Sequence, residues 1–223
     1  MCCRFARFAL FGLVAATPVR AADDQGQLWL NWQAGWPIRG RLLGHFDTSS
    51  RIGTSTGRLE QFLVRAGLGW RASPTVTLQA GWFYSSVWPD PGREQREHRG
   101  HQQVVLQLAA GQGWSLQART RIEERFNLDR DGLSIRFRQQ ARLNVDLGLP
   151  RGVRPFLAPE VLVTVVAADA WGPRRGVDQA RQVVGVAVPL ARTQTLEVSY
   201  MTIWFPQSDR LTHIPQIQLV SRF

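Results

Sequence analysis

Alternation of apolar and polar residues with a period of two is the feature that most constrains the fold of this chain. Residues 135–147 read IRFRQQARLNVDL, with an apolar side chain at every odd position except Gln139 and a polar or charged one at the even positions. Because successive side chains of a strand point to opposite faces, this stretch is expected to form a strand with one apolar and one charged face. The same alternation recurs at 61–70, 75–84, 115–126 and 195–204, which predicts an all-β protein.

A soluble β-sandwich also alternates, but two further patterns favour a closed barrel in a membrane. The polar face carries charges in mid-strand and the apolar face carries aromatic residues near strand ends, which is typical of lipid-facing strands around a polar interior. Connections also alternate in length, as periplasmic turns and outer loops do in outer-membrane barrels. We expect short connections at 72–74, 111–113, 148–152 and 190–194, and long ones near 48–60, 85–100, 127–134, 168–176 and 205–211.

The end of the chain supports the same class. In IQLVSRF, the side chains of Ile217, Leu219 and Phe223 share one face, and the last residue is aromatic. This ending resembles the C-terminal signature by which outer-membrane barrels are recognised for insertion, although Ser221 stands where a tyrosine or an apolar residue is usual. We therefore expect a bacterial outer-membrane location, surrounding outer-membrane lipid, and the barrel-insertion machinery as a partner of the last strand.

The strand count is expected to be about ten, the even number typical of bacterial single-chain barrels, with both ends on the periplasmic side. Twelve strands is the alternative. Residues 22–37 are then an N-terminal segment that leads into a barrel formed by 38–223, with 27–36 paired at the seam or tucked into the barrel. The expected strands lie near 38–47, 60–71, 75–84, 101–110, 114–126, 135–147, 153–166, 177–189, 195–205 and 212–223.

Residues 1–21 are typical of a secretory signal peptide, the alternative being a buried N-terminal strand or helix. Arg4 and Arg7 precede the apolar run 8–16, and Ala21 ends a suitable cleavage site. Cleavage there removes both cysteines, so the mature chain has neither disulfides nor thiolate metal ligands. The net charge of +10 is spread along the whole chain, and export argues against a nucleic-acid partner, so none is expected.

The inward polar faces define a candidate site. A barrel of about ten strands has a narrow lumen that side chains largely fill. Because neighbouring arginine-rich strands bring like charges together, they need carboxylates or water between them. The residues expected in the lumen are Arg39, Arg41, Arg65, Arg119, Arg121, Glu123, Arg125, Arg136, Arg138, Arg142, Asp146, Glu160, Arg181 and Glu197.

These charges allow two roles. We expect a satisfied structural network that packs the lumen, because arginine forks pair well with carboxylates. The alternative is an anion-preferring constriction, or an interior pocket for an acidic group, since arginines outnumber the inward carboxylates. No cofactor or metal is expected: the histidines of REHRGH (96–101) lie among arginines without a carboxylate cluster, and no phosphate-cradling glycine loop appears.

Several of these segments resemble an uncharacterised family of outer-membrane β-barrels, a domain of unknown function. The resemblance rests on RIEERF, IRFRQQARLNV, PFLAPEV, DQARQVVGVAV and HIPQIQLVSRF, and it covers most of residues 27–223. It implies a barrel and a compartment but no activity. The first segment, broken by Pro37, departs from the full hairpin that is usual there. The residues that occupy the family pattern are Arg121 and Arg125, Arg136 and Arg138, Glu160, and Arg181 with Gly185.

Two other functions remain as alternatives. Small outer-membrane barrels include lipid-modifying hydrolases, and His45 with Asp47 could meet His213, Ser208 and Asp209 at the closure of the barrel. No hydrolase motif surrounds these residues, so we do not expect an enzyme. The other alternative is a soluble periplasmic β-sandwich that serves as a binding module.

Overall fold

A computed structural model describes residues 26–223, which form a closed β-barrel of eleven strands. The predicted signal peptide, residues 1–21, lies outside the described residues. Within residues 26–223, no helix is long and apolar enough to cross a membrane. The elements are β1 (Gln27–Arg39), β2 (Leu42–Gly53), β3 (Leu59–Arg71), β4 (Val76–Asp90), β5 (Arg93–Gly111), β6 (Trp114–Asn127), β7 (Leu133–Val145), the 3-10 turn η1 (Pro150–Gly152), β8 (Arg154–Val166), β9 (Gly176–Ala191), β10 (Gln194–Phe205) and β11 (Arg210–Arg222).

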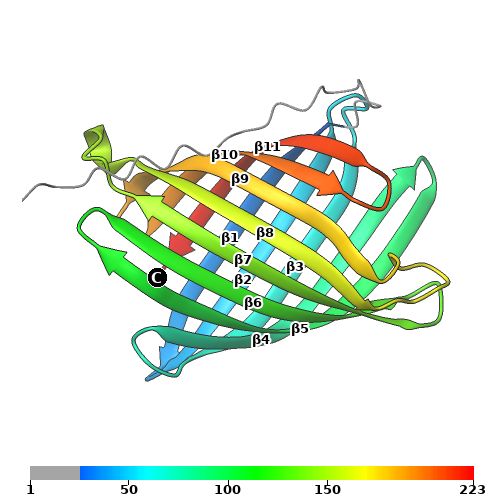
Figure 1. Cartoon of the computed structure of the whole chain (residues 1–223), viewed down its shortest axis with the longest axis horizontal. Coiled ribbons are helices and arrows are strands. Elements are labelled where there is room, and N and C mark those ends of the chain that lie inside the picture. The colour runs from blue at the N-terminus through cyan, green and yellow to red at the C-terminus, as the bar shows by residue number, and fades with distance from the viewer. Residues whose placement is uncertain (1–25) are drawn as a thin grey trace, which may run out of the picture.

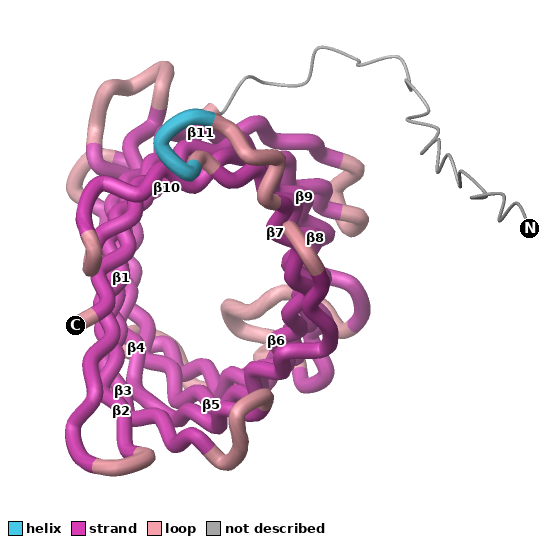
Figure 2. Tube along the Cα trace, turned by 90° about the vertical axis from the view of Figure 1, so that its left-hand side faces the viewer, coloured by secondary structure: helices cyan, strands magenta, loops and turns pink. Residues whose placement is uncertain are grey.

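Strands that follow one another in sequence pair antiparallel around the wall, and the tilted strands are visible side by side in Figure 1. Closure is different: β1 and β11 pair in parallel, with Leu30 opposite Ile217 and Trp32 opposite Leu219. Viewed along the barrel, the Cα trace forms a ring (Figure 2). An odd number of strands requires this parallel seam, because an antiparallel closure needs an even number.

The all-β barrel predicted from the sequence is confirmed, and its strand count of eleven falls between the expected ten and the alternative twelve. The difference arises at the start of the chain. Residues 27–36 were expected to lead into the barrel, either paired at the seam or tucked inside. They pair at the seam and form most of β1, a full strand of the wall. The strand expected at 38–47 is divided by a turn at 40–41, so that 42–47 begin β2, and 48–53, expected in a long connection, continue that strand.

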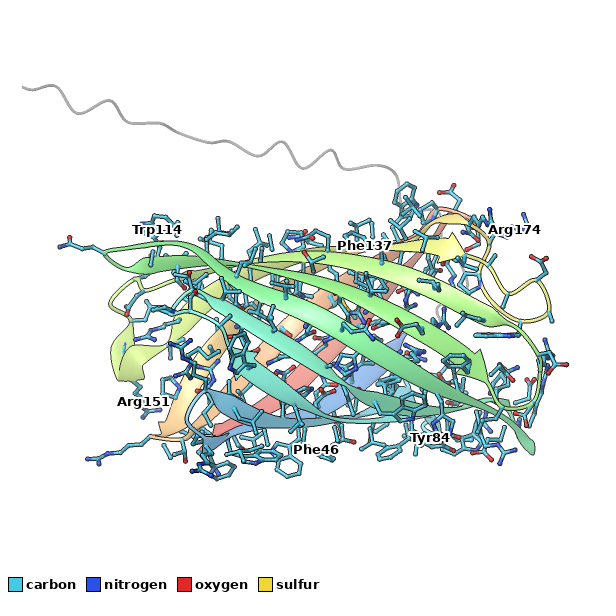
Figure 3. All side chains as sticks on the ribbon, turned by 90° about the horizontal axis from the view of Figure 1, so that it is seen from below. Phe46, Tyr84, Trp114, Phe137, Arg151 and Arg174 are labelled. Carbon is cyan, nitrogen blue, oxygen red and sulfur yellow. The ribbon has the colours of Figure 1, made fainter. Side chains whose placement is uncertain are left out.

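The barrel has two rims, which we name by the chain ends that lie there. The C-terminal rim holds Phe223, which follows β11, and the connections 40–41, 72–75, 112–113, 146–153 and 192–193. The N-terminal rim holds Gln27 and the connections 54–58, 91–92, 128–132, 167–175 and 206–209. In Figure 3, Arg151 and Arg174 mark the two rims.

Two expectations about the rims are wrong. The two ends of the described chain lie at opposite rims and not at the same one, because the number of strands is odd. Residues 85–100, expected as a long loop, mostly continue β4 and β5, which meet in a turn at 91–92. The 19 residues of β5 exceed the roughly 9–11 needed to cross a bilayer, so this hairpin is longer than the span requires.

The outer surface of the wall is apolar. Phe46, Tyr84, Trp114 and Phe137 lie on it in Figure 3. Exposed leucine, valine and isoleucine side chains occur along the strands, including Leu68, Val184 and Val198. Exposed aromatic residues lie near the strand ends, at Trp36, Trp70 and Trp114 close to the C-terminal rim and at Phe126 and Trp204 close to the N-terminal rim, and also in mid-strand, at Trp32, Trp82 and Tyr200.

The interior is divided into two sectors. On the side of β1, β10 and β11, buried Trp29, Met201, Ile203 and Ile214 form an apolar cluster. The opposite side, from β5 to β8, carries buried arginines and glutamates on its inward face. The lumen is therefore packed with side chains, and its charges lie mainly on one side of the barrel.

Candidate functional site in the barrel lumen

The register of the strands brings the interior charges to a common level. His45 pairs with Gly67, Gly67 with Gly81, Gly81 with His101, and His101 with Glu123. Glu123 in turn pairs with Arg136 on β7. This row crosses half of the wall, and its inward side chains form the centre of the candidate site.

Glu123 is the centre of the network, with its side chain only 3% exposed. Arg136 donates to its Oε2 atom from Nη2 at 2.7 Å, and Arg138 donates to its Oε1 atom from Nη1 at 2.8 Å. The guanidinium groups of Arg99 and Arg121 lie at 3.7 and 3.5 Å from the same carboxylate. One glutamate therefore contacts four arginines drawn from β5, β6 and β7.

Glu160 on β8 forms a second centre beside the first. Arg138 donates to it from Nε and Nη2, and Arg119 on β6 donates from Nη2 at 2.9 Å. Arg181 on β9 lies 3.7 Å away. Since β6 and β8 are not neighbours, the contact with Arg119 passes over β7 on the inner face of the wall. Arg138 links the two centres because it binds both Glu123 and Glu160.

A third carboxylate extends the network along β5. The Glu97 carboxylate accepts two hydrogen bonds from Arg99, at 2.9 and 3.0 Å, and two from Arg125, at 2.6 and 3.2 Å. Such bidentate pairs fix the plane of both groups as well as their distance. Asp178 on β9 adds a contact of 3.2 Å to Arg136, which ties β9 to β7.

Two ion pairs lie apart from these centres. Arg142 on β7 makes a bidentate contact with Glu197 on β10, at 3.2 and 2.8 Å. Since two strands separate β7 from β10, this pair crosses the lumen. Arg65 on β3 binds Asp47 on the neighbouring β2 at 3.2 Å.

Of the fourteen charged residues expected in the lumen, the structure places eleven inside the barrel and three outside it. Asp146 follows β7 and pairs with Arg154 at 3.2 Å on the exposed C-terminal rim. β7 ends at Val145, one residue before Asp146, so Asp146 does not belong to the inward face of the strand. Arg39 and Arg41, also expected in the lumen, are exposed at the turn between β1 and β2. The eleven inward residues are Arg65, Arg119, Arg121, Glu123, Arg125, Arg136, Arg138, Arg142, Glu160, Arg181 and Glu197.

Sequence reasoning missed several members of the network. Glu97 and Arg99 were assigned to a loop, although the alternation of 101–110 could have been extended backwards to include them. Asp47 was considered only as a partner of a catalytic histidine. No sequence pattern identified Asp178 as a member of the network, because its partner Arg136 lies 42 residues away in the chain.

The network has an excess of positive charge. Nine arginines lie within 4.0 Å of only six carboxylates, which leaves three positive charges without a carboxylate of their own. Arg51 adds to this excess. It stacks on Trp29 with its guanidinium carbon 3.6 Å from the ring centroid, and it donates to Gln61 at 2.6 Å.

The histidines do not assemble into a catalytic cluster. His45 points into the lumen, where its ring centroid lies 5.8 Å from that of His101. His213 lies on the outer face of β11 and contacts the Tyr200 hydroxyl at 2.9 Å. The residues that a hydrolase site required are thus on opposite faces of the wall, and the proposed grouping of His45 with His213 is not formed.

The two histidines of REHRGH are also separated. His98 faces outward and accepts a hydrogen bond from Trp82 Nε1 at 2.7 Å, whereas His101 is buried inside. Among residues 26–223, no group of three or more histidine, cysteine, aspartate and glutamate side chains is arranged to hold a metal ion.

The residues of the expected insertion signal occupy the outer face of the seam. Ile217 and Phe223 are exposed, and Leu219 lies opposite Trp32. The Phe223 amide donates to the carbonyl oxygen of Gly35 at 3.0 Å, which ties the last residue to β1.

Comparison with known proteins identifies a family. The family model that matches is described as "Protein of unknown function (DUF2490)" and covers residues 26–213. An uncharacterised protein of Methylorubrum extorquens is 27% identical over 205 residues, which is 89% of this chain and 88% of that protein. Among solved structures, the siderophore receptor PirA of Pseudomonas aeruginosa gives a TM-score of 0.28 at 14% identity, over 81% of this chain and 34% of the receptor.

Proposed function

This chain belongs to the DUF2490 family of proteins of unknown function, and from the geometry of its own lumen we propose that it is an outer-membrane barrel closed by an arginine–carboxylate network. The observation that carries the proposal is the contact of Glu123 with four arginines in the packed interior. Its role is structural: the network holds the wall together and blocks the free passage of solutes.

The membrane location is supported by the two faces of the wall. Leucine, valine and tryptophan side chains are exposed on the outside, whereas most of the charged residues of the strands point inward. In water such a surface would favour aggregation, and in lipid it is the ordinary outer surface of a barrel. We propose outer-membrane lipid as its surroundings, and the barrel-insertion machinery as the partner that binds β11 through Ile217, Leu219 and Phe223.

Closure is supported by the burial of the ion pairs. Arg121, Glu123 and Arg136 are each no more than 5% exposed, so little water reaches the centre of the network. Opening a path there would separate buried opposite charges, and breaking such pairs is costly. The apolar cluster around Trp29 and Met201 fills the other side of the interior.

A narrow, anion-preferring pore is the second candidate. The excess of three positive charges in the network favours it, because a positive interior attracts anions and repels cations. A hydrolase has less support, since His45 and His213 lie on opposite faces, and we propose that the chain is not an enzyme.

Two measurements test the proposal. Cell fractionation should recover the protein in the outer membrane as a heat-modifiable, detergent-extracted species, and recovery in the soluble periplasm would refute the membrane barrel. Proteoliposomes should then show no swelling in small sugars or salts. Swelling that is faster in salts of small anions than in salts of large anions would favour the pore.

A further inference from the structure

A cavity of about 180 Å³ lies inside the barrel beside the arginine–carboxylate network. Most of its lining consists of inward side chains of the first six strands and of β11, and Arg119 and Arg121 connect it to the network. The other charged residues of its wall are Arg65 and Asp47. The cavity is thus a defined space next to the charge excess described above.

The electrostatics of this cavity favour an anion. Three arginines face it and only one carboxylate, Asp47, balances them directly. The carboxylates that bind Arg119 and Arg121 are Glu160 and Glu123, and each of these is shared with Arg138. A cation would meet a repelling field in this space, whereas an anion would meet an attracting one.

The hydrogen-bonding groups of the cavity also suit an oxyanion. Each guanidinium has five N–H donors. Arg65 uses one of them on Asp47, and Arg121 uses Nε on Gln103 at 2.7 Å and Nη1 on Glu123 at 3.5 Å. The buried Ser49 hydroxyl and both ring nitrogens of His45 have no hydrogen-bond partner in the described structure. Most of the remaining polar wall consists of neutral amides.

The volume of the cavity limits the size of the ligand that it can hold. A water molecule occupies roughly 30 Å³ in the liquid, so about 180 Å³ corresponds to a small ion with a few waters. Pockets for drug-sized ligands are larger, roughly 300–1,000 Å³. The space does not admit the acyl chains of a lipid.

We propose that this cavity binds a small tetrahedral oxyanion of the phosphate or sulfate class, held by Arg65, Arg119 and Arg121. Free phosphate and a lipid headgroup share this chemistry, and the volume favours the free ion. The proposal goes beyond closure of the lumen, since a closed barrel does not need to bind an anion.

Calorimetric titration of the purified barrel in a non-ionic detergent with inorganic phosphate tests the site. The wild type should show saturable binding of one phosphate per chain. Arg65→Gln should weaken it at least tenfold, because Arg65 lines the cavity and contacts only one carboxylate. Arg154→Gln is the matched control: it also removes an arginine from an ion pair with an aspartate, but on the exposed C-terminal rim, and it should leave the affinity unchanged.

A second variant separates loss of the site from loss of the fold. Asp47→Asn removes the single carboxylate of the cavity and should strengthen phosphate binding several-fold, a gain that misfolding cannot produce. A short-chain phosphatidic acid should bind more weakly than free phosphate. Absence of saturable phosphate binding by the wild type, equal affinity in Arg65→Gln, weaker binding in Asp47→Asn, or preference for the lipid would each overturn the proposal. None of these results depends on conductance, so they leave the closed-lumen proposal to its own test.

Discussion

The Glu123 carboxylate on β6 accepts hydrogen bonds from the guanidinium group of Arg136, its paired residue on β7, at 3.1 Å from Nε and 2.7 Å from Nη2. This ion pair connects two neighbouring strands, and each of its residues also contacts a further charged side chain. Glu123 also forms an ion pair with Arg138, which lies on β7 like Arg136, and Arg136 forms a second ion pair with Asp178 on β9. Removing either partner therefore affects three strands at once.

Glu123→Gln should destabilise the barrel strongly. The change leaves Arg136 and Arg138 buried with less carboxylate to balance them, and breaking a buried pair costs about 3–5 kcal/mol. Urea unfolding in lipid vesicles, followed by tryptophan fluorescence, measures the change in the free energy of unfolding. Asp146→Asn removes an exposed ion pair instead, and its cost should stay within about 1 kcal/mol. Equal costs for the two variants would contradict a central role for Glu123.

The row of paired residues that contains Glu123 includes two glycines, Gly67 and Gly81. A Cβ atom on Gly67 would collide with the Ala80 carbonyl oxygen and with the His45 ring. Gly67→Ala should therefore cost about 1–3 kcal/mol, the usual penalty for overpacking. Gly69→Ala, on the same face of β3, would meet Gln79 Cγ at 3.3 Å, a flexible side chain, and should cost much less. The same unfolding assay compares them, and a smaller effect at Gly67 than at Gly69 would refute this packing.

A lipid-facing substitution distinguishes a membrane barrel from a soluble one. Val184, in the middle of β9, is 54% exposed on the outer surface. Val184→Arg should cost about 2–4 kcal/mol in a bilayer, whereas Leu190→Arg, near the C-terminal rim, should cost about 0–1 kcal/mol. Unfolding from lipid vesicles measures the difference. If both variants are as stable as the wild type, the outer face does not contact lipid.

The connection between β6 and β7 should respond to acid. Asp129 accepts a hydrogen bond from Arg96 Nη2 at 3.0 Å, and this contact holds the pKa of Asp129 below its usual value. Because the pKa is lowered, the contact contributes fully to stability above the ordinary aspartate pKa, about 3.9. This contribution declines below that pH and is lost once the pH has fallen through the lowered pKa.

Hydrogen exchange of the Arg96 amide, which also points to Asp129, should thus rise below about pH 4 after correction for intrinsic exchange rates. Asp129→Asn should raise exchange at neutral pH and remove this pH dependence, and Asp131→Asn, in the same connection, should leave the wild-type pattern. Persistence of the acid response in Asp129→Asn would assign it to another group.

Much of this architecture could be predicted from period-two alternation, because one face of each strand contacts the interior and the other does not. That alternation identified the inward arginines of β6 and β7. It also predicted the C-terminal strand. These properties are local, since each is encoded within a single strand.

The remaining features depend on contacts that no single strand specifies. Pairing of β1 with β11 joins residues at the two ends of the chain, and it fixes the odd strand number and the parallel seam. The contact of Arg142 with Glu197 crosses the lumen between strands that are not neighbours. Likewise, His45 and His101 meet only because Gly67 and Gly81 lie between them in the wall.

Electrical conductance of the purified barrel in planar lipid bilayers tests the central claim, that the network around Glu123 closes the lumen. The wild type, inserted and held at either polarity, should show no discrete conductance steps. Glu123→Ala combined with Arg136→Ala removes the paired side chains at the centre of the network, and this variant should open small steps and thereby demonstrate insertion. Stable, ohmic steps from the wild type itself, of the same size as those of the double variant, would contradict a closed lumen.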